Sequence, residues 1–189
     1  MKILLLNGSH RTGGNTETLL SVMKTGFEKQ GLETELISLA TLSVEHCQVC
    51  DSCKGKSTCR ITDDFGAILE KISVSDALII GTPVYVGMPS SRLAALIQRL
   101  TYLALLNGHL LKDKIGCAVV VAGEAGHLTA LNSLLDFFLV NEMTVPGSRY
   151  WPVGTASKKG EILNDTAAIE NVKYLSGKIA KLLKTGGAR

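Results

Sequence analysis

Residues 3–16 of the chain are Ile-Leu-Leu-Leu-Asn-Gly-Ser-His-Arg-Thr-Gly-Gly-Asn-Thr. A short apolar run that stops at glycine is typical of a strand buried on both faces of a parallel sheet. Asn15 is a favourable helix-capping residue, and apolar residues recur at helical spacing from Leu19 to Phe27. This stretch therefore predicts a buried strand, a glycine-rich loop and an amphipathic helix in immediate succession.

The same alternation of strand and helix patterns continues along the chain. The predicted strands cover residues 3–6, 34–37, 77–80 and 118–121, with a fifth strand at 144–145 and 150–151 that is interrupted by Pro146-Gly147. The predicted helices cover residues 15–30, 89–100, 128–140 and 165–184, and the second of them has Pro89 as its first residue. Strands that alternate with helices predict an α/β fold, here one doubly wound domain with a parallel sheet over residues 1–189.

Composition and charge narrow the functional classes. The 189 residues are 46% hydrophobic and 20% charged, which is typical of a folded protein and excludes a disordered or collagen-like chain. The formal net charge of +3 is small and spread along the chain, so nucleic acid and membranes are not expected as partners. The apolar run after Lys2 is too short for a signal peptide or a membrane span, and we expect a cytoplasmic protein.

Three loops follow predicted strands directly, at residues 7–15, 81–87 and 122–127. In a doubly wound fold, ligands bind beyond the carboxyl ends of the strands, at the point where the strand order reverses. All three loops are rich in glycine, serine, threonine or proline. We therefore expect them to converge on one ligand site.

The first loop has the chemistry of a phosphate site. Its glycines let several backbone N–H groups point inward, and the start of the helix adds partial positive charge. Ser9 and Thr16 offer hydroxyl groups, and Arg11 can pair with a dianion. Neither the Walker pattern nor the dinucleotide fingerprint is matched, so ATP hydrolysis and a Rossmann dinucleotide site are disfavoured. A glycine-rich turn without a ligand is the alternative.

The second and third loops suit a flat ring. Pro83 biases the residue before it toward an extended backbone, which exposes main-chain groups to the polar edge of a ring, and Tyr85 can lie against the ring's face. The third loop would place amide groups near the same ring. Ordinary packing of Tyr85 and a helix-start role for His127 are the alternatives.

These loops together resemble the NADPH-dependent FMN reductase family of flavodoxin-like proteins. The likeness covers most of the chain and rests on Gly8-Ser9 through Arg11, Gly14-Asn15-Thr16, Thr82-Pro83-Val84-Tyr85, and Gly123 with Gly126. It implies a sheet in the order 2-1-3-4-5, with the FMN phosphate in the first loop and the isoalloxazine ring between the second and the third. The cofactor-binding residues expected from the loops and the resemblance are Ser9, His10, Arg11, Gly14, Asn15, Thr16, Thr82, Pro83, Val84, Tyr85, Val86, Gly87, Gly123, Gly126 and His127. The chain departs from the family at His10, where proline is usual, and at Gln98-Arg99, where Asp-Arg is frequent.

Four of the five cysteines lie close together in the sequence, at Cys47, Cys50, Cys53 and Cys59. In a reducing compartment, such a dense set indicates metal binding or redox activity before it indicates disulfides. The compact spacing favours a 4Fe–4S cluster, because a short loop can wrap it; a zinc site, and free or locally bridged thiols, are the alternatives. Cys117 lies in a predicted strand and is expected to be a buried small hydrophobe.

The spacing Cys-x2-Cys-x2-Cys-x5-Cys lies in an insertion at about residues 43–63, after the second strand, and resembles the iron–sulfur flavoproteins. The resemblance implies a 4Fe–4S cluster that passes electrons to FMN, and a homodimer or homotetramer. We therefore expect a flavin-dependent oxidoreductase without a catalytic protein nucleophile, with NAD(P)H or reduced ferredoxin as donor and a quinone, oxygen or peroxide as acceptor. The alternatives are an NAD(P)H-dependent FMN or quinone reductase without a cluster, and a non-enzymatic electron carrier or thiol redox sensor.

Overall fold

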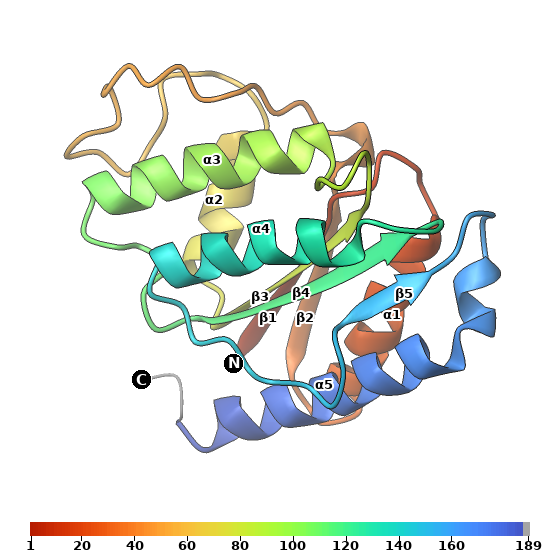
Figure 1. Cartoon of the computed structure of the whole chain (residues 1–189). Helices are drawn as coiled ribbons and strands as arrows, with labels where there is room; N and C mark the ends of the chain where they lie inside the picture. Colours follow the sequence, from red (N-terminus) through yellow and green to blue (C-terminus); the bar gives the residue numbers. More distant parts are fainter. Residues whose placement is uncertain (187–189) are drawn as a thin grey trace.

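A computed structural model describes residues 1–186, in which five parallel strands form a sheet in the order β2-β1-β3-β4-β5 (Figure 1). The strands are β1 (Lys2–Asn7), β2 (Glu33–Ser38), β3 (Ala77–Pro83), β4 (Ile115–Ala122) and β5 (Val153–Thr155). The strand order reverses between β1 and β3, which pair side by side in the middle of the sheet. The expected α/β fold class and the flavodoxin-like order 2-1-3-4-5 are confirmed.

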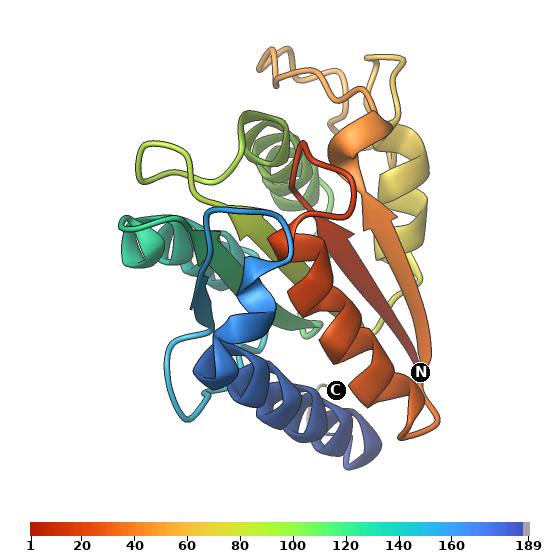
Figure 2. The ribbon, with the colours of Figure 1, turned by 90° about the vertical axis from the view of Figure 1, so that its right-hand side faces the viewer.

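Helices cover both faces of the sheet. They are α1 (Asn15–Glu28), α2 (Phe65–Ser73), α3 (Ser91–Leu106), α4 (His127–Val140) and α5 (Thr166–Lys184), with short 3-10 turns η1 (Leu39–Thr41) and η2 (Glu161–Asn164). Helices α1 and α5 pack on one side of the sheet, and α2, α3 and α4 pack on the other (Figure 2). The molecule therefore has three layers, and the carboxyl ends of the strands form one open edge.

The continuous apolar runs of the strands follow from this layering. Successive side chains of a strand point to opposite faces, so Ile3 and Leu5 pack against α1 and α5, whereas Leu4 and Leu6 join the core on the other side. All four are almost fully buried. Each such aliphatic side chain contributes about 1.5–3 kcal/mol when it leaves water, which favours this two-sided burial.

The prediction of a fifth strand at residues 144–145 and 150–151 is wrong. The strand that pairs with β4 is Val153–Thr155, and Thr144 makes only an isolated bridge. Pro146 and Pro152 have no N–H group to donate to a strand ladder, so the chain between them leaves the edge of the sheet.

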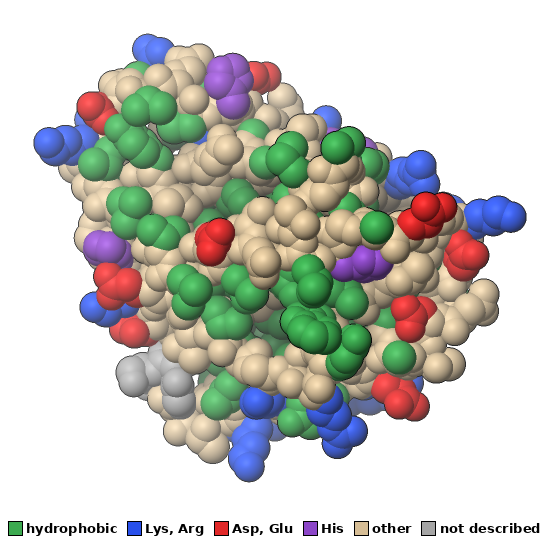
Figure 3. All heavy atoms as spheres, in the orientation of Figure 1, with side chains coloured by type: hydrophobic (Ala, Val, Ile, Leu, Met, Phe, Trp, Pro, Cys, Tyr) green, Lys and Arg blue, Asp and Glu red, His purple; other side chains and the backbone are tan. Residues whose placement is uncertain are grey.

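The departing segment opens a cavity of about 540 Å³ beside β4 and α4, with mainly apolar lining residues. Figure 3 shows apolar side chains gathered on the face that carries this segment, and Tyr150 and Trp151 are among the exposed apolar residues. No residue of the three predicted ligand loops lines this cavity. In the part of the chain that the structure describes, no helix combines the length and apolar composition needed to cross a membrane.

Two helices differ from their predictions. Helix α3 begins at Ser91 and not at Pro89, because Ser90 caps it with an Oγ that accepts a hydrogen bond from the Leu93 N–H at 3.4 Å. Helix α2 is missed by the sequence prediction. It is only nine residues long and follows the cysteine-rich segment directly, so its apolar stripe is too short to stand out.

The packing of α1 on the end of β3 can be tested at Gly81. A Cβ on Gly81 would lie 2.7 Å from Leu20 Cδ1 and 2.9 Å from Thr16 Cγ2. We predict that Gly81→Ala lowers the free energy of unfolding by about 1–3 kcal/mol, because the extra methyl group overpacks the core. Gly66→Ala in α2 is the control, because a Cβ there meets nothing within 4 Å. Urea unfolding followed by circular dichroism measures both variants, and equal stabilities would contradict the prediction.

Candidate functional site

The three predicted loops meet at the carboxyl edge of the sheet, around a cavity of about 280 Å³. Nine of the expected cofactor-binding residues line it: Ser9, Arg11, Gly14, Asn15, Thr16, Pro83, Val84, Tyr85 and Gly123. The other six do not line it: His10, Thr82, Val86, Gly87, Gly126 and His127. Sequence reasoning missed four further lining residues, which are Val121, Ala156, Ser157 and Lys159.

The start of α1 presents free backbone donors to this cavity. Within residues 1–186, the N–H groups of Gly14, Asn15 and Thr16 donate to no protein acceptor, and no side chain caps the helix. The Gly13 N–H is already bonded to the Glu17 carboxylate at 2.9 Å. Free N–H groups at a helix start, where the helix dipole is positive, are typical of an anion site.

The side chains of Ser9 and Asn15 form hydrogen bonds within the protein and also line the cavity. The Ser9 hydroxyl accepts a hydrogen bond from the Arg11 N–H at 3.0 Å and so stabilises the turn. Asn15 Nδ2 donates to the Lys158 carbonyl oxygen at 2.8 Å, and its Oδ1 accepts from the Gly160 N–H at 2.9 Å. The amide of Asn15 therefore anchors the loop that follows β5.

That loop, residues 156–160, is a fourth wall of the cavity. It places Lys159 Nζ 3.3 Å from the Thr12 carbonyl oxygen, so that a second cation joins Arg11 beside the first loop. The sequence signal that could have found it is the pair Lys158-Lys159 directly after the last strand. The sequence predicts the fifth strand before residue 152, whereas β5 is Val153–Thr155, so residues 156–160 could not be recognised as a loop at a strand end.

The second loop is a tight hairpin turn. Tyr85 and Met88 exchange two backbone hydrogen bonds of 2.9 and 3.0 Å. Val86 and Gly87 between them have φ values of 52° and 74°, a pair of positive values that suits a two-residue hairpin. The third loop approaches this turn closely, because a Cβ on Gly126 would lie only 3.0 Å from Gly87 Cα.

Free main-chain donors lie in both loops near this turn: within residues 1–186, the N–H groups of Val86 and Gly87 donate to no acceptor. The N–H of Val84 is bonded to the Val121 carbonyl oxygen at 2.9 Å, and the N–H of Tyr85 is bonded within the turn. In contrast, the N–H groups of residues 123–125 donate to no acceptor among residues 1–186. The N–H groups of Val84 and Tyr85 are therefore engaged within the protein, and the role of the second loop beside a ring stays a prediction.

The remaining predicted residues support the loops. His10 stacks on Tyr85, a lining residue of the cavity, with ring centroids 6.0 Å apart. The Thr82 hydroxyl is buried and accepts a hydrogen bond from the Ser90 N–H at 3.1 Å. His127 Nε2 lies 3.1 Å from a carbonyl oxygen of β5, which matches the helix-start alternative.

The cysteine-rich segment, residues 42–64, contains no helix or strand and extends over α3 (Figure 1). Side chains of α3 hold it in place. Asn107 Nδ2 donates to the Cys53 carbonyl oxygen at 2.9 Å, and the Tyr102 hydroxyl donates to the Asp51 carboxylate. The hydrogen bond to Asp51 raises the pKa of Tyr102 to about 12.

Cys47, Cys50, Cys53 and Cys59 line one small cavity, of about 20 Å³. All five cysteines are free thiols, and no three His, Cys, Asp or Glu side chains in residues 1–186 lie close enough together to hold a metal ion. Hydrogen bonds with Ser52 lower the pKa of the exposed Cys50 thiol, whereas burial raises the pKa of Cys53. Cys117 is buried in β4, as expected, and burial raises its pKa to about 12.

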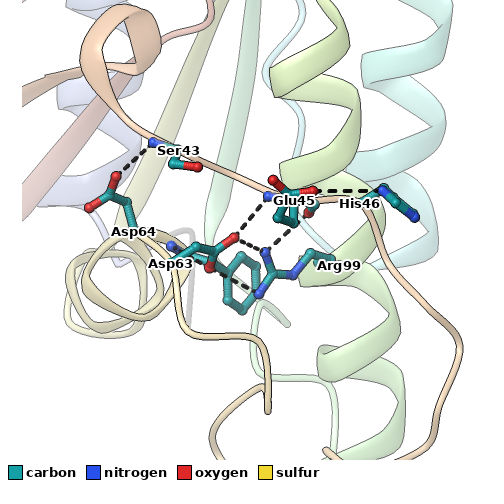
Figure 4. A network of polar contacts seen from close by, with 7 residues as sticks. Ser43, Glu45, His46, Asp63, Asp64 and Arg99 are labelled. Carbon is teal, nitrogen blue, oxygen red and sulfur yellow. Dashed lines mark hydrogen bonds and ion pairs between the residues drawn. The ribbon is translucent and has the colours of Figure 1, made fainter.

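A buried ion pair closes the base of the cysteine-rich segment (Figure 4). The side chains of Arg99 and Asp63 are 1% and 4% exposed, and the guanidinium bonds both carboxylate oxygens. Asp63 also accepts the N–H groups of Glu45 at 2.8 Å and Phe65 at 3.2 Å. Burial acts to raise the pKa of Asp63, but the bonds to Arg99 and the backbone outweigh it and lower that pKa. The acidic partner of Arg99 thus comes from the cysteine-rich segment and not from position 98.

The sequence model of the NADPH-dependent FMN reductase family matches residues 1–158. An iron–sulfur flavoprotein of Methanocaldococcus jannaschii is 34% identical to the chain, over 97% of this chain and 98% of that protein. An iron–sulfur flavoprotein of Methanosarcina thermophila is 30% identical, over 97% and 96% of the two chains.

A solved structure is similar in fold alone. The structure of RosB with the bound intermediate 8-demethyl-8-formylriboflavin-5'-phosphate has a TM-score of 0.77 and 22% identity, over 98% of this chain and 81% of that chain. The family match spans all five strands and the loops that line the cavity at their ends, apart from the last residues of the fourth. The chain belongs to the NADPH-dependent FMN reductase family and is a flavin-dependent oxidoreductase.

Proposed function

We propose that the protein passes electrons between a 4Fe–4S cluster in the cysteine-rich segment and an FMN at the strand ends, and then to a small acceptor such as a quinone, oxygen or peroxide. NAD(P)H and reduced ferredoxin are the candidate donors. The observation that carries the proposal is that four thiols and a buried guanidinium line one cavity of a flavin-dependent oxidoreductase. A cytoplasmic location and a homodimer or homotetramer stay predictions.

The FMN phosphate would lie at the start of α1. The free N–H groups of residues 14–16 supply hydrogen-bond donors there, and Arg11 and Lys159 supply positive charge. Charge-assisted hydrogen bonds to a phosphate are stronger than neutral ones, so this end of the cavity favours a dianion. The residues present therefore fit the phosphate group.

The isoalloxazine ring would lie between the second and third loops, against Tyr85. The free N–H groups of residues 123–125 can donate to the polar edge of the ring and stabilise negative charge there. FMN supplies hydride and single-electron transfer when bound, while these residues orient it. His10, stacked on Tyr85, would limit the ring's access to water on that side.

The cluster would be held by Cys47, Cys50, Cys53 and Cys59. Four soft thiolates in a short loop suit iron–sulfur binding, and a 4Fe–4S cluster supplies one-electron transfer when bound. The hydrogen bonds from α3 fix the backbone of the loop, and all four thiols line one cavity. The two relatives that are named iron–sulfur flavoproteins support this choice over zinc.

The phosphate position can be tested at Lys159. We predict that Lys159→Gln weakens FMN binding about tenfold, because it removes a charge-assisted contact worth roughly 1.5 kcal/mol. Lys158→Gln is the matched control: it makes the same charge change next to the cavity, but Lys158 does not line it. Quenching of FMN fluorescence on titration gives both dissociation constants. Equal losses in the two variants would show that only the overall charge matters.

The cluster can be tested at Cys50. We predict that anaerobically purified Cys50→Ala loses its iron but keeps FMN, because the thiols and the flavin cavity share no residue. Cys117→Ala, in β4, is expected to keep both. Iron, zinc and flavin analysis with an absorbance spectrum measures the outcome.

The same samples separate the other functions. Wild-type protein that contains zinc or no metal, and oxidises NAD(P)H rapidly with FMN, would support a cluster-free reductase. Protein that exchanges electrons with a protein partner but turns over no small acceptor would support a carrier.

A further inference from the structure

Arg99 has one donor that no protein group uses. Its Nη1 and Nη2 atoms are bonded to Asp63 and to the Glu45 carbonyl oxygen, and the Phe65 ring lies 4.1 Å from its guanidinium carbon. Its Nε is buried and has no hydrogen-bond partner within residues 1–186. A buried donor without an acceptor destabilises a fold, so such an atom indicates an acceptor that belongs beside it.

The space beside Arg99 is the cavity of the four thiols, which Arg99 also lines. The guanidinium is charged, because arginine is not deprotonated in proteins, and the four thiols are the sulfur groups that share its cavity.

We propose that Arg99 is a positioning residue for the cluster: its Nε–H donates to a sulfur of the cluster site that Arg99 lines, and its charge raises the reduction potential of the group held there. The inference rests on the proposed function, because it needs a redox group at that position. Reduction adds one electron from the donor and one negative charge, and no covalent bond forms or breaks. A buried cation stabilises that added charge more than an exposed one does, because water and salt screen it less.

The ion pair with Asp63 predicts the direction in which each substitution shifts the reduction potential. Asp63 pairs end-on with Nη1 and Nη2, so the ion pair leaves Nε free on a residue that lines the cavity of the four thiols. Removal of the Arg99 charge leaves Asp63 as an uncompensated negative charge, and removal of the Asp63 charge leaves Arg99 uncompensated. The two changes should move the potential in opposite directions, whereas a merely structural role would not.

Mediated redox titrations of the iron-loaded protein, followed by absorbance and electron paramagnetic resonance, test the inference. Arg99→Gln is expected to lower the midpoint potential by at least 59 mV, a tenfold change in the equilibrium constant for one electron. Arg99→Lys keeps the positive charge but loses the paired hydrogen bonds to Asp63, so its downward shift of the midpoint potential is smaller. Asp63→Asn is expected to raise the midpoint potential. Lys56→Gln is the matched control, because Lys56 is an exposed cation of the same segment that does not line the cavity of the four thiols; we expect a change of less than threefold in the equilibrium constant.

Iron content is measured for every variant. If Arg99→Gln fails to fold or to keep its iron, the comparison of Arg99→Lys with Asp63→Asn decides. Potentials that equal the wild-type value in both of these variants, or that shift with the same sign, would overturn the inference. Wild-type protein that holds no iron would refute the proposed function itself.

Discussion

The hydrogen bond from the Gly8 N–H to the Gly81 carbonyl oxygen, 2.7 Å long, joins the ends of the two central strands. The Ser90 hydroxyl donates to the Gly8 carbonyl oxygen, so the start of α3 is tied to the same point. A Cβ on Gly8 would lie 2.8 Å from Leu93 Cδ2, and glycine is therefore required for this approach. These contacts fix the crevice where the strand order reverses, and they thereby set the positions of the loops around that crevice.

Helix α3 connects the two functional regions. Its capping residue Ser90 is bonded to the first loop, and Arg99 and Tyr102 hold the cysteine-rich segment. The nine steps from Ser90 to Arg99 span about 14 Å of helix axis, at a rise of 1.5 Å per residue. A flavin at the strand ends and a redox group among the thiols would thus border the same rigid element.

The parts that the sequence predicts well are those with local signals. The apolar run of β1, the glycine-rich turn and the stripe of α1 are adjacent in sequence, so the first loop and the place of the helix start could be predicted from residues 3–27. The cap expected from Asn15 is wrong, because Gly14 precedes the helix and no side chain within residues 1–186 caps it. Contacts between distant residues could not be predicted. Asn15 anchors a loop more than 140 residues away, and Arg99 finds its acid at position 63 instead of next to it. The place of β5 depends on which residues fit the edge of β4, and two prolines moved it beyond the predicted segment.

A crystal structure of the protein grown with FMN would show whether the loops at the strand ends bind this cofactor. We expect the phosphate against the N–H groups of residues 14–16, between Arg11 and Lys159, and the ring beside Tyr85. FMN in the larger cavity behind Pro146 and Pro152 would contradict the account, as would an unchanged strand-end cavity at saturating FMN.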